Sequence, residues 1–236
     1  WILFERNVRI DQEGQLTAAE TVLAYFDETT STLKQVELRG GGSITSKVGH
    51  SAKFEAMQAQ DIDLLYGEPG GILRDASLRE NASIKMKGEA GETGQRVSGQ
   101  LIDVSFGSDG VLLTNLDVQG GVDVELPTDT QRPARRILAG VMSTVGNEEE
   151  GLTEAAFTND VEYREVSREG SLESRVDRVI RSTRLETSLR GGIGIIEKAR
   201  FIGNVVFEDL AVDRVVASDT LETMLTGGSE GLQTAQ

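Results

Sequence analysis

A hairpin pattern that recurs about every 40 residues is the feature that most constrains the fold of this chain. Its clearest copy runs from Leu101 to Leu126, where Ile102, Val104 and Phe106 occupy alternate positions before the turn GSDG, and a second apolar run follows. Alternation with a period of two predicts a strand with one buried face, and glycines around Ser-Asp between two such runs predict a turn. This copy therefore predicts one β-hairpin.

Equivalent positions mark further copies along the whole chain. The second strand of each hairpin carries one of the anchors Leu33, Leu73, Leu113, Leu152, Ile196 and Leu232. A glycine or asparagine follows most anchors by seven positions, with Glu80 as the exception. A fixed period of this length indicates an array of one supersecondary unit, so we expect a single elongated domain over residues 1–236. The first and last hairpins are incomplete, and we therefore expect a chain truncated at both ends.

The segment 127–136, PTDTQRPARR, is the candidate for a sub-boundary within this domain. The apolar pattern resumes on phase after it, which favours a loop. Stacked hairpins predict an all-β protein with one wide antiparallel sheet, and such a sheet must curl to cover an apolar face. Glycine in the middle of a strand, as at Gly40 and Gly120, indicates a bend. We therefore expect a curled, open antiparallel trough built from tandem β-hairpins.

Residues on the apolar side of the alternation, including those that precede each anchor by eleven positions, are the candidate lining of the trough. They are Val22, Phe26, Leu38, Ile62, Leu64, Tyr66, Leu78, Ile102, Val104, Phe106, Val118, Val141, Phe157, Leu185, Leu189, Phe201, Val205, Phe207, Leu221 and Leu225. One interpretation is a packed core, in which these side chains contact only one another. The other is an open groove that holds hydrocarbon, because small residues such as Ala24 and Thr187 on the same face leave room for chains.

Charge and residue usage exclude several classes of function. The net charge of −15 argues against nucleic acid as a partner, because such binding depends on Lys and Arg neutralising phosphates. A chain without cysteine has no disulfides, zinc–thiolate sites or cysteine nucleophiles. The single histidine, His50, is expected in a surface loop, and Asp61 and Asp63 on the solvated face of a strand. We therefore expect no enzymatic activity, no cofactor and no metal site.

Three stretches carry the repeat most fully, namely residues 16–45, 180–209 and 217–235. Each has small residues in a first strand and a polar or glycine-rich turn, and GNV follows in the second strand of 180–209. In tandem, these motifs resemble the OstA-like β-jellyroll family of periplasmic lipopolysaccharide-transport (Lpt) proteins. The resemblance implies a twisted, open β-jellyroll that holds lipid acyl chains and pairs edge to edge with other β-jellyroll components. It also implies a periplasmic location, with any inner-membrane anchor in a segment absent from this chain.

The sequence thus favours a non-enzymatic conduit that binds lipopolysaccharide or a related lipid and carries it toward the outer membrane during assembly of the cell envelope. The main alternative is a structural or adhesive β-repeat protein with a dry core, which predicts no bound lipid. A further alternative is an outer-membrane β-barrel, because alternating strands of about ten residues also suit that class. Aromatic residues make up only 5% of the chain, too few for two convincing interfacial girdles.

Overall fold

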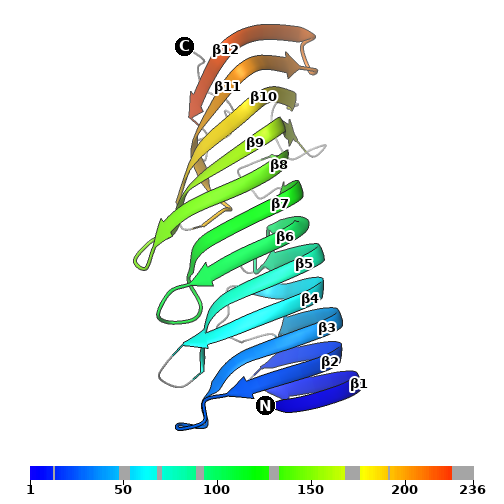
Figure 1. Ribbon diagram of the computed structural model, residues 1–236. Coiled ribbons are helices and arrows are strands. Elements are labelled where there is room, and N and C mark those ends of the chain that lie inside the picture. Colours follow the sequence, from blue (N-terminus) through cyan, green and yellow to red (C-terminus); the bar gives the residue numbers. More distant parts are fainter. Residues whose placement is uncertain are drawn as a thin grey trace.

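Twelve strands form one antiparallel sheet in which each strand pairs with the next along the chain (Figure 1). The structure, a computed structural model, describes residues 1–12, 14–47, 54–67, 71–88, 93–127, 133–167, 176–190 and 192–224. The strands are β1 (Ile2–Gln12), β2 (Gln15–Phe26), β3 (Leu33–Ser46), β4 (Phe54–Gly67), β5 (Ile72–Met86), β6 (Arg96–Phe106), β7 (Leu113–Leu126), β8 (Ala134–Asn147), β9 (Gly151–Val166), β10 (Asp177–Leu189), β11 (Ile196–Asp209) and β12 (Arg214–Met224). β1 and β12 are the edges of the sheet and do not pair with each other, so the sheet is open. The predicted all-β fold of tandem hairpins is confirmed.

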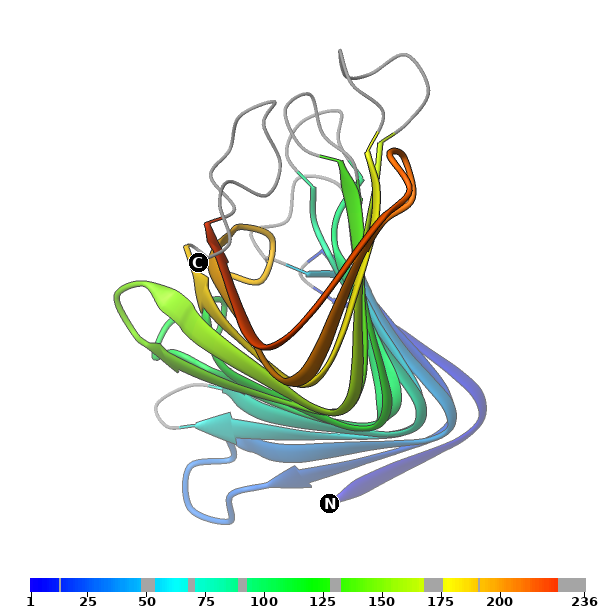
Figure 2. The same ribbon diagram turned by 90° about the horizontal axis from the view of Figure 1, so that it is seen from above.

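The sheet is folded along its length into a V, which is seen from above in Figure 2. We call one arm of the V the turn leaf, because it ends in the β2–β3, β4–β5, β6–β7, β8–β9 and β10–β11 turns. The other arm, the loop leaf, carries the remaining connections. The V rotates gradually from β1 to β12, as the right-handed twist of β-strands requires. The curled trough expected from the repeat is therefore present, and β7 pairs with β8 across the segment 127–136.

Two consecutive residues with positive φ bend every odd-numbered strand near its middle. The pairs are Arg6–Asn7, Gly40–Gly41, Glu80–Asn81, Gly120–Gly121, Asn159–Asp160 and Gly203–Asn204. At the same level, the register shifts in every strand pairing of the sheet. An extra residue on one strand of a pair is a β-bulge, which bends the strand. Aligned across the sheet, these bulges form the crease between the two leaves.

Glu80 stands at the crease although its side chain disfavours the required backbone conformation. Its φ is 61°, whereas the equivalent Gly40 and Gly120 both have a φ of 76°. A residue with a Cβ reaches this left-handed region at a cost of roughly 1–2 kcal/mol, from which glycine is exempt. Glu80 thus departs from the Gly or Asn of the sequence repeat but has the same left-handed conformation as the equivalent residues, because the paired strands on both sides of β5 impose the bend.

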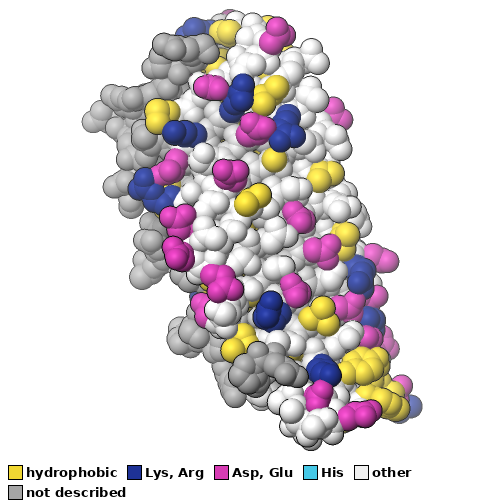
Figure 3. Space-filling view, turned by 60° about the vertical axis from the view of Figure 1, so that its left-hand side comes forward, with side chains coloured by type: hydrophobic (Ala, Val, Ile, Leu, Met, Phe, Trp, Pro, Cys, Tyr) yellow, Lys and Arg dark blue, Asp and Glu magenta, His cyan; other side chains and the backbone are white. Residues whose placement is uncertain are grey.

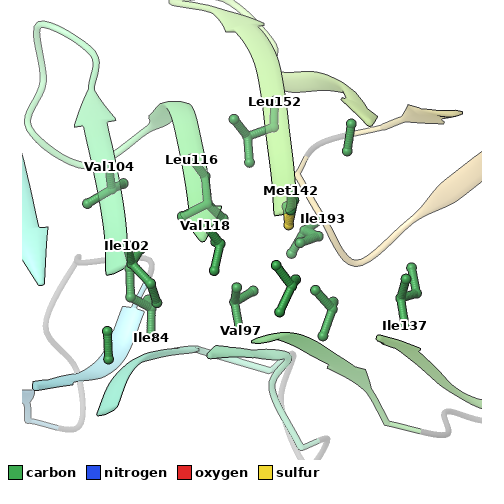
Figure 4. Close-up of a cluster of buried hydrophobic side chains, with 14 of the residues drawn as sticks. Ile84, Val97, Ile102, Val104, Leu116, Val118, Ile137, Met142, Leu152 and Ile193 are labelled. Atoms are coloured by element: carbon green, nitrogen blue, oxygen red, sulfur yellow. The ribbon is translucent and has the colours of Figure 1, made fainter. Parts of the chain in front are cut away.

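The core lies between the two leaves, and its side chains come from alternate positions of nearly every strand. Figure 4 shows Ile102, Leu116 and Val118 of the turn leaf opposite Ile84 and Val97 of the loop leaf. All five of these side chains are inaccessible to solvent. A single sheet with one apolar face buries that face here by folding upon itself, so no second layer is needed.

Candidate functional site

An apolar row runs through the interior of the trough from β2 to β12, one residue for each strand. We call it the interior row: Val22, Leu38, Ile62, Leu78, Ile102, Val118, Met142, Phe157, Leu185, Phe201 and Leu221. Each member lies directly opposite the next on the neighbouring strand, and all are buried. Neighbouring strands lie about 4.8 Å apart, so the row is a continuous apolar track along the long axis.

Most of the predicted lining residues lie in this interior. The buried ones are Val22, Leu38, Ile62, Leu64, Leu78, Ile102, Val104, Phe106, Val118, Phe157, Leu185, Leu189, Phe201, Val205 and Leu221. Tyr66 and Phe207 are partly buried and pack against the core. Phe26 is 38% exposed, because β1 begins opposite Ala24 and does not extend alongside the end of β2. Leu225 lies outside the described residues.

The prediction for Val141 is wrong, because this side chain lies on the outer face. Val141 is opposite Thr158 and Gln119, whereas its neighbour Met142 is opposite Phe157 and is fully buried. The β8–β9 hairpin is one residue shorter than the others: Gly146 pairs with Leu152, where Phe106 pairs with Leu113 in the β6–β7 hairpin. A shift of one residue moves every side chain of a strand to the opposite face. Counting eleven positions back from the anchor therefore selects the wrong residue here.

Sequence reasoning missed most of the loop leaf. Its buried residues include Met57, Ile84, Val97, Ile137, Tyr163 and Ile180. These residues nevertheless keep nearly constant distances from the anchors. Met57, Val97 and Ile180 precede Leu73, Leu113 and Ile196 by sixteen positions, and Ile137 precedes Leu152 by fifteen. Ile84 and Tyr163 follow Leu73 and Leu152 by eleven positions. The local alternation of Ile137 and Ala139 is the kind of signal that identifies them. Buried Ile193 lies in the β10–β11 turn and has no periodic signal at all.

A polar cluster is buried in the loop leaf among these apolar side chains. Tyr163 donates its hydroxyl hydrogen to Oε1 of Glu165 at 3.1 Å, and both residues are almost inaccessible to solvent. Arg178 lies 3.7 Å from Oε2 of Glu165 and 3.1 Å from Asp209. Burial raises the pKa of the Glu165 carboxyl, and this effect exceeds the lowering caused by the Tyr163 hydrogen bond and by the charges of Arg135 and Arg178.

The cluster is incompletely satisfied. Nε of Arg135 and Oε2 of Glu165 are buried without a hydrogen-bond partner. Such a group costs about 1–3 kcal/mol relative to a satisfied one. The interior of the trough is thus apolar along the interior row and locally polar where β8, β9 and β10 meet in the loop leaf.

A shallow hollow of about 930 Å³ lies on the outer face of the turn leaf, over β8 to β12. Exposed charged residues of alternate positions line it, among them Glu154, Lys198, Arg200 and Glu222. Arg200 lies 3.0 Å from Glu222 and 4.0 Å from Glu186, so several charges in the hollow pair with one another. Four buried residues, Ala155, Thr187, Ala199 and Thr223, also line the hollow.

The outer surface carries interspersed acidic and basic side chains, and hydrophobic side chains gather at the lower end in Figure 3. That end is the β1 end of the molecule, where Trp1, Ile2, Leu3 and Phe4 are exposed. Asp61 and Asp63 lie on the outer face as expected, and Asp63 lies 2.6 Å from Arg39 and also pairs with Arg79. His50 lies outside the described residues. Within the described part of the chain, no group of acidic or histidine side chains has the arrangement of a metal site.

Taken together, fold and interior define a creased, open antiparallel trough of tandem hairpins with a continuous apolar lining. Comparisons with protein-family models, with curated proteins and with solved structures found no match for the chain. Among the described residues, no helix has the length and apolar character needed to cross a membrane.

Proposed function

We propose that this protein is a non-enzymatic, periplasmic lipid-binding conduit that carries lipopolysaccharide or a related lipid toward the outer membrane. The observation that carries the proposal is the interior row, which joins one buried apolar residue from each of the strands β2 to β12. A track of this kind has the length and chemistry to accompany acyl chains along the molecule. The resemblance of residues 16–45 and 180–209 to the OstA-like family supports the same class of cargo.

The physical basis is the transfer of hydrocarbon from water into the trough. Each buried CH₂ group is worth about 0.8 kcal/mol, so an acyl chain of about a dozen carbons gains several kcal/mol net of the groups that it displaces. Side chains such as Ile62, Leu78 and Ile102 offer no directional contacts that would fix a chain at one position. Binding of this kind is strong enough to extract a chain from water and uniform enough to let it move along the row.

The edges of the sheet are the proposed contacts with other β-jellyroll transport components. Among the described residues, β1 and β12 each pair with one strand only, so one side of each has backbone N–H and C=O groups without a strand partner there. An exposed strand edge accepts a further strand by β-augmentation. Apolar side chains exposed near these edges, Phe4 on β1 and Val215 on β12, add surface that such a neighbour would cover.

A structural or adhesive repeat protein with a dry core is the second candidate. The observation that favours it is the complete burial of side chains in the middle of the trough, including Leu38, Leu116 and Ile137. In the absence of lipid these residues are already fully covered by the protein's own atoms. Lipid binding therefore requires the leaves to separate or an internal element to move, whereas a structural role requires neither.

Site-specific photocrosslinking separates the two candidates. A benzoylphenylalanine replaces Phe157 or Phe201, which face the interior, or their neighbours Ala156 and Arg200, which face outward. Detergent-free protein is irradiated with and without lipopolysaccharide. We expect a lipopolysaccharide adduct from the two interior positions and none from the outer pair. Folded protein without an adduct at the interior positions, or with equal adducts at all four, would favour the dry core.

A further inference from the structure

The β10–β11 turn crosses the mouth of the trough. We call its residues Gly192 to Ile195 the strap. The strap leaves the turn leaf after β10 and curls back over the space between the leaves, where it appears in orange in Figure 2. Arg190 N donates to the carbonyl oxygen of Ile195 at 3.0 Å and closes the turn. Ile193 is only 4% exposed and belongs to the hydrophobic core.

Ile193 lies between the two leaves. Figure 4 shows it beside Met142 of the turn leaf, on the side that faces Val97 and Ile137 of the loop leaf. All three neighbours are fully buried. A side chain from a turn therefore occupies interior volume that elsewhere belongs to strand residues.

The strap is anchored to the loop leaf by its backbone. Nη2 of Arg135 donates to the carbonyl oxygen of Gly194 at 3.4 Å. A Cβ at Gly194 would lie 2.5 Å from Nε2 of Gln95, so the backbone passes in contact with that side chain. Arg135 is the second residue of β8 and lies in the loop leaf, and Gln95 immediately precedes β6. The strap therefore bridges the two leaves and closes the trough at this level.

The space beneath the strap is lined by small side chains. The row next to the interior row, on its turn side, contains Thr144, Ala155, Thr187 and Ala199, each directly opposite the next. The same row in β4 to β7 contains Leu64, Ala76, Val104 and Leu116. Smaller side chains leave more room between the leaves at β8 to β11. All four small residues are nevertheless buried.

The attachment of the strap is weak compared with that of a strand. Its hydrogen bond to Arg135 is long at 3.4 Å, and its Ile195 side chain is 41% exposed. One buried apolar side chain, Ile193, holds it in the interior. A hydrocarbon chain that enters the same space buries more apolar surface than a single isoleucine does, and it therefore competes for this position.

We propose that the trough beneath the strap is a hydrocarbon-binding site that the chain fills with its own Ile193, and that a bound acyl chain displaces the strap. This inference rests on the proposed lipid-binding function and adds a place of entry and a means of control to it. In the absence of lipid, the strap keeps water out of a space lined by small residues. When an acyl chain binds, Ile193 leaves the interior and the contacts of Gly194 with Arg135 and Gln95 break.

The test is a reducible lock. The chain contains no cysteine, so the double substitution Gln95→Cys with Gly194→Cys introduces a single pair across the mouth of the trough. The probe is cis-parinaric acid, a fatty acid that becomes fluorescent in an apolar site. We expect at least about tenfold weaker binding of the probe to the oxidised form, a difference of about 1.4 kcal/mol, and full recovery after reduction with dithiothreitol. A matched control is Ser77→Cys with Asp103→Cys, because these side chains lie on the outer face of neighbouring strands of one leaf.

A second variant, Ile193→Ser, tests the plug without a crosslink. It removes apolar surface from the strap but no strand residue, and we expect tighter binding of the probe than in the wild type. Equal affinities for the oxidised lock, the reduced lock and the wild type would overturn the strap proposal while leaving lipid binding intact. If the wild type, the reduced lock and Ile193→Ser all fold and none binds the probe, both the strap and the proposed function are overturned.

Discussion

Tyr163 and Glu165 form a hydrogen bond inside the trough, with the phenolic oxygen 3.1 Å from Oε1 of the carboxyl group. The two residues are two positions apart on β9, so the alternation of the strand places both side chains on the interior face. Tyr163 also packs edge to face against Phe201 of β11, with ring centroids 5.7 Å apart. The Glu165 carboxyl is thus held in the apolar interior by the hydroxyl of Tyr163, and its titration makes the stability of the fold depend on pH.

Glu165→Gln is predicted to gain stability relative to the wild type as the pH rises. Burial raises the pKa of Glu165 above its ordinary value of 4.5, so the folded protein holds the proton more tightly than the unfolded chain. Between the ordinary and the raised pKa, the free energy of unfolding of the wild type therefore falls with rising pH. A glutamine side chain does not titrate in this range, so its contribution to the free energy of unfolding does not change with pH. Urea denaturation from about pH 4 to about pH 8 measures the difference.

The control for this prediction is Glu154→Gln, because Glu154 is exposed on the outer face. The difference in the free energy of unfolding between Glu154→Gln and the wild type is expected to show no comparable rise over the same pH range. A constant difference between Glu165→Gln and the wild type at every pH would contradict the assignment of a raised pKa to Glu165.

Met142→Ala and Val141→Ala are predicted to differ sharply although the residues are adjacent. Met142 is fully buried in the interior row, so its truncation leaves a cavity and costs about 2–4 kcal/mol of unfolding free energy. Val141 faces outward, and its truncation costs about 0.5 kcal/mol. Urea denaturation of the two variants measures both values. The reverse order would show that β8 has the register predicted from the repeat spacing instead.

Gly120→Ala is predicted to destabilise the crease more than Gly121→Ala. Both glycines have a positive φ, 76° and 78°, so either substitution costs roughly 1–2 kcal/mol of backbone strain. A Cβ at Gly120 would also lie 2.8 Å from Cβ of Gln100, whereas a Cβ at Gly121 meets nothing within 4 Å. Thermal unfolding of the two variants measures the difference. An equal loss of stability in the two variants would mean that Gln100 of β6 moves away from the added Cβ at no cost.

Glu80→Gly is predicted to stabilise the protein. The φ of 61° at Glu80 is strained for a residue with a Cβ, and the side chain is exposed, so its removal gives up little contact. Relief of roughly 1–2 kcal/mol of strain exceeds the entropic cost of glycine of about 0.5–1 kcal/mol, which leaves a gain of about 0.5 kcal/mol. A lower urea midpoint for Glu80→Gly than for the wild type would show that the left-handed conformation is unstrained there.

The repeat predicted much of the fold because hairpin formation is a local property. The alternation of Ile102, Val104 and Phe106 identified the buried face of β6 without any knowledge of its neighbours. Spacing from the anchors placed the crease at Gly40 and Gly120, since these glycines follow the anchors by a constant number of residues. The spacing also showed that Glu80 occupies the position equivalent to these glycines, but it did not predict the left-handed conformation of Glu80. That conformation is imposed by the strands paired with β5.

The sequence by itself determined the architecture of this protein: tandem hairpins, one apolar face and a bend in every second strand. The tertiary structure decided which face Val141 occupies, because register depends on the length of the β8–β9 turn and on the strands paired with β8. It also decided that Ile193 enters the core and that Arg135 approaches Gly194, a residue far from it in the chain. Alternation is a local property, because it depends only on residues that are close together in the sequence. The position of the β10–β11 turn and the partners of a buried charge such as Arg135 depend instead on contacts between the two leaves. These contacts form only when the sheet folds along its crease.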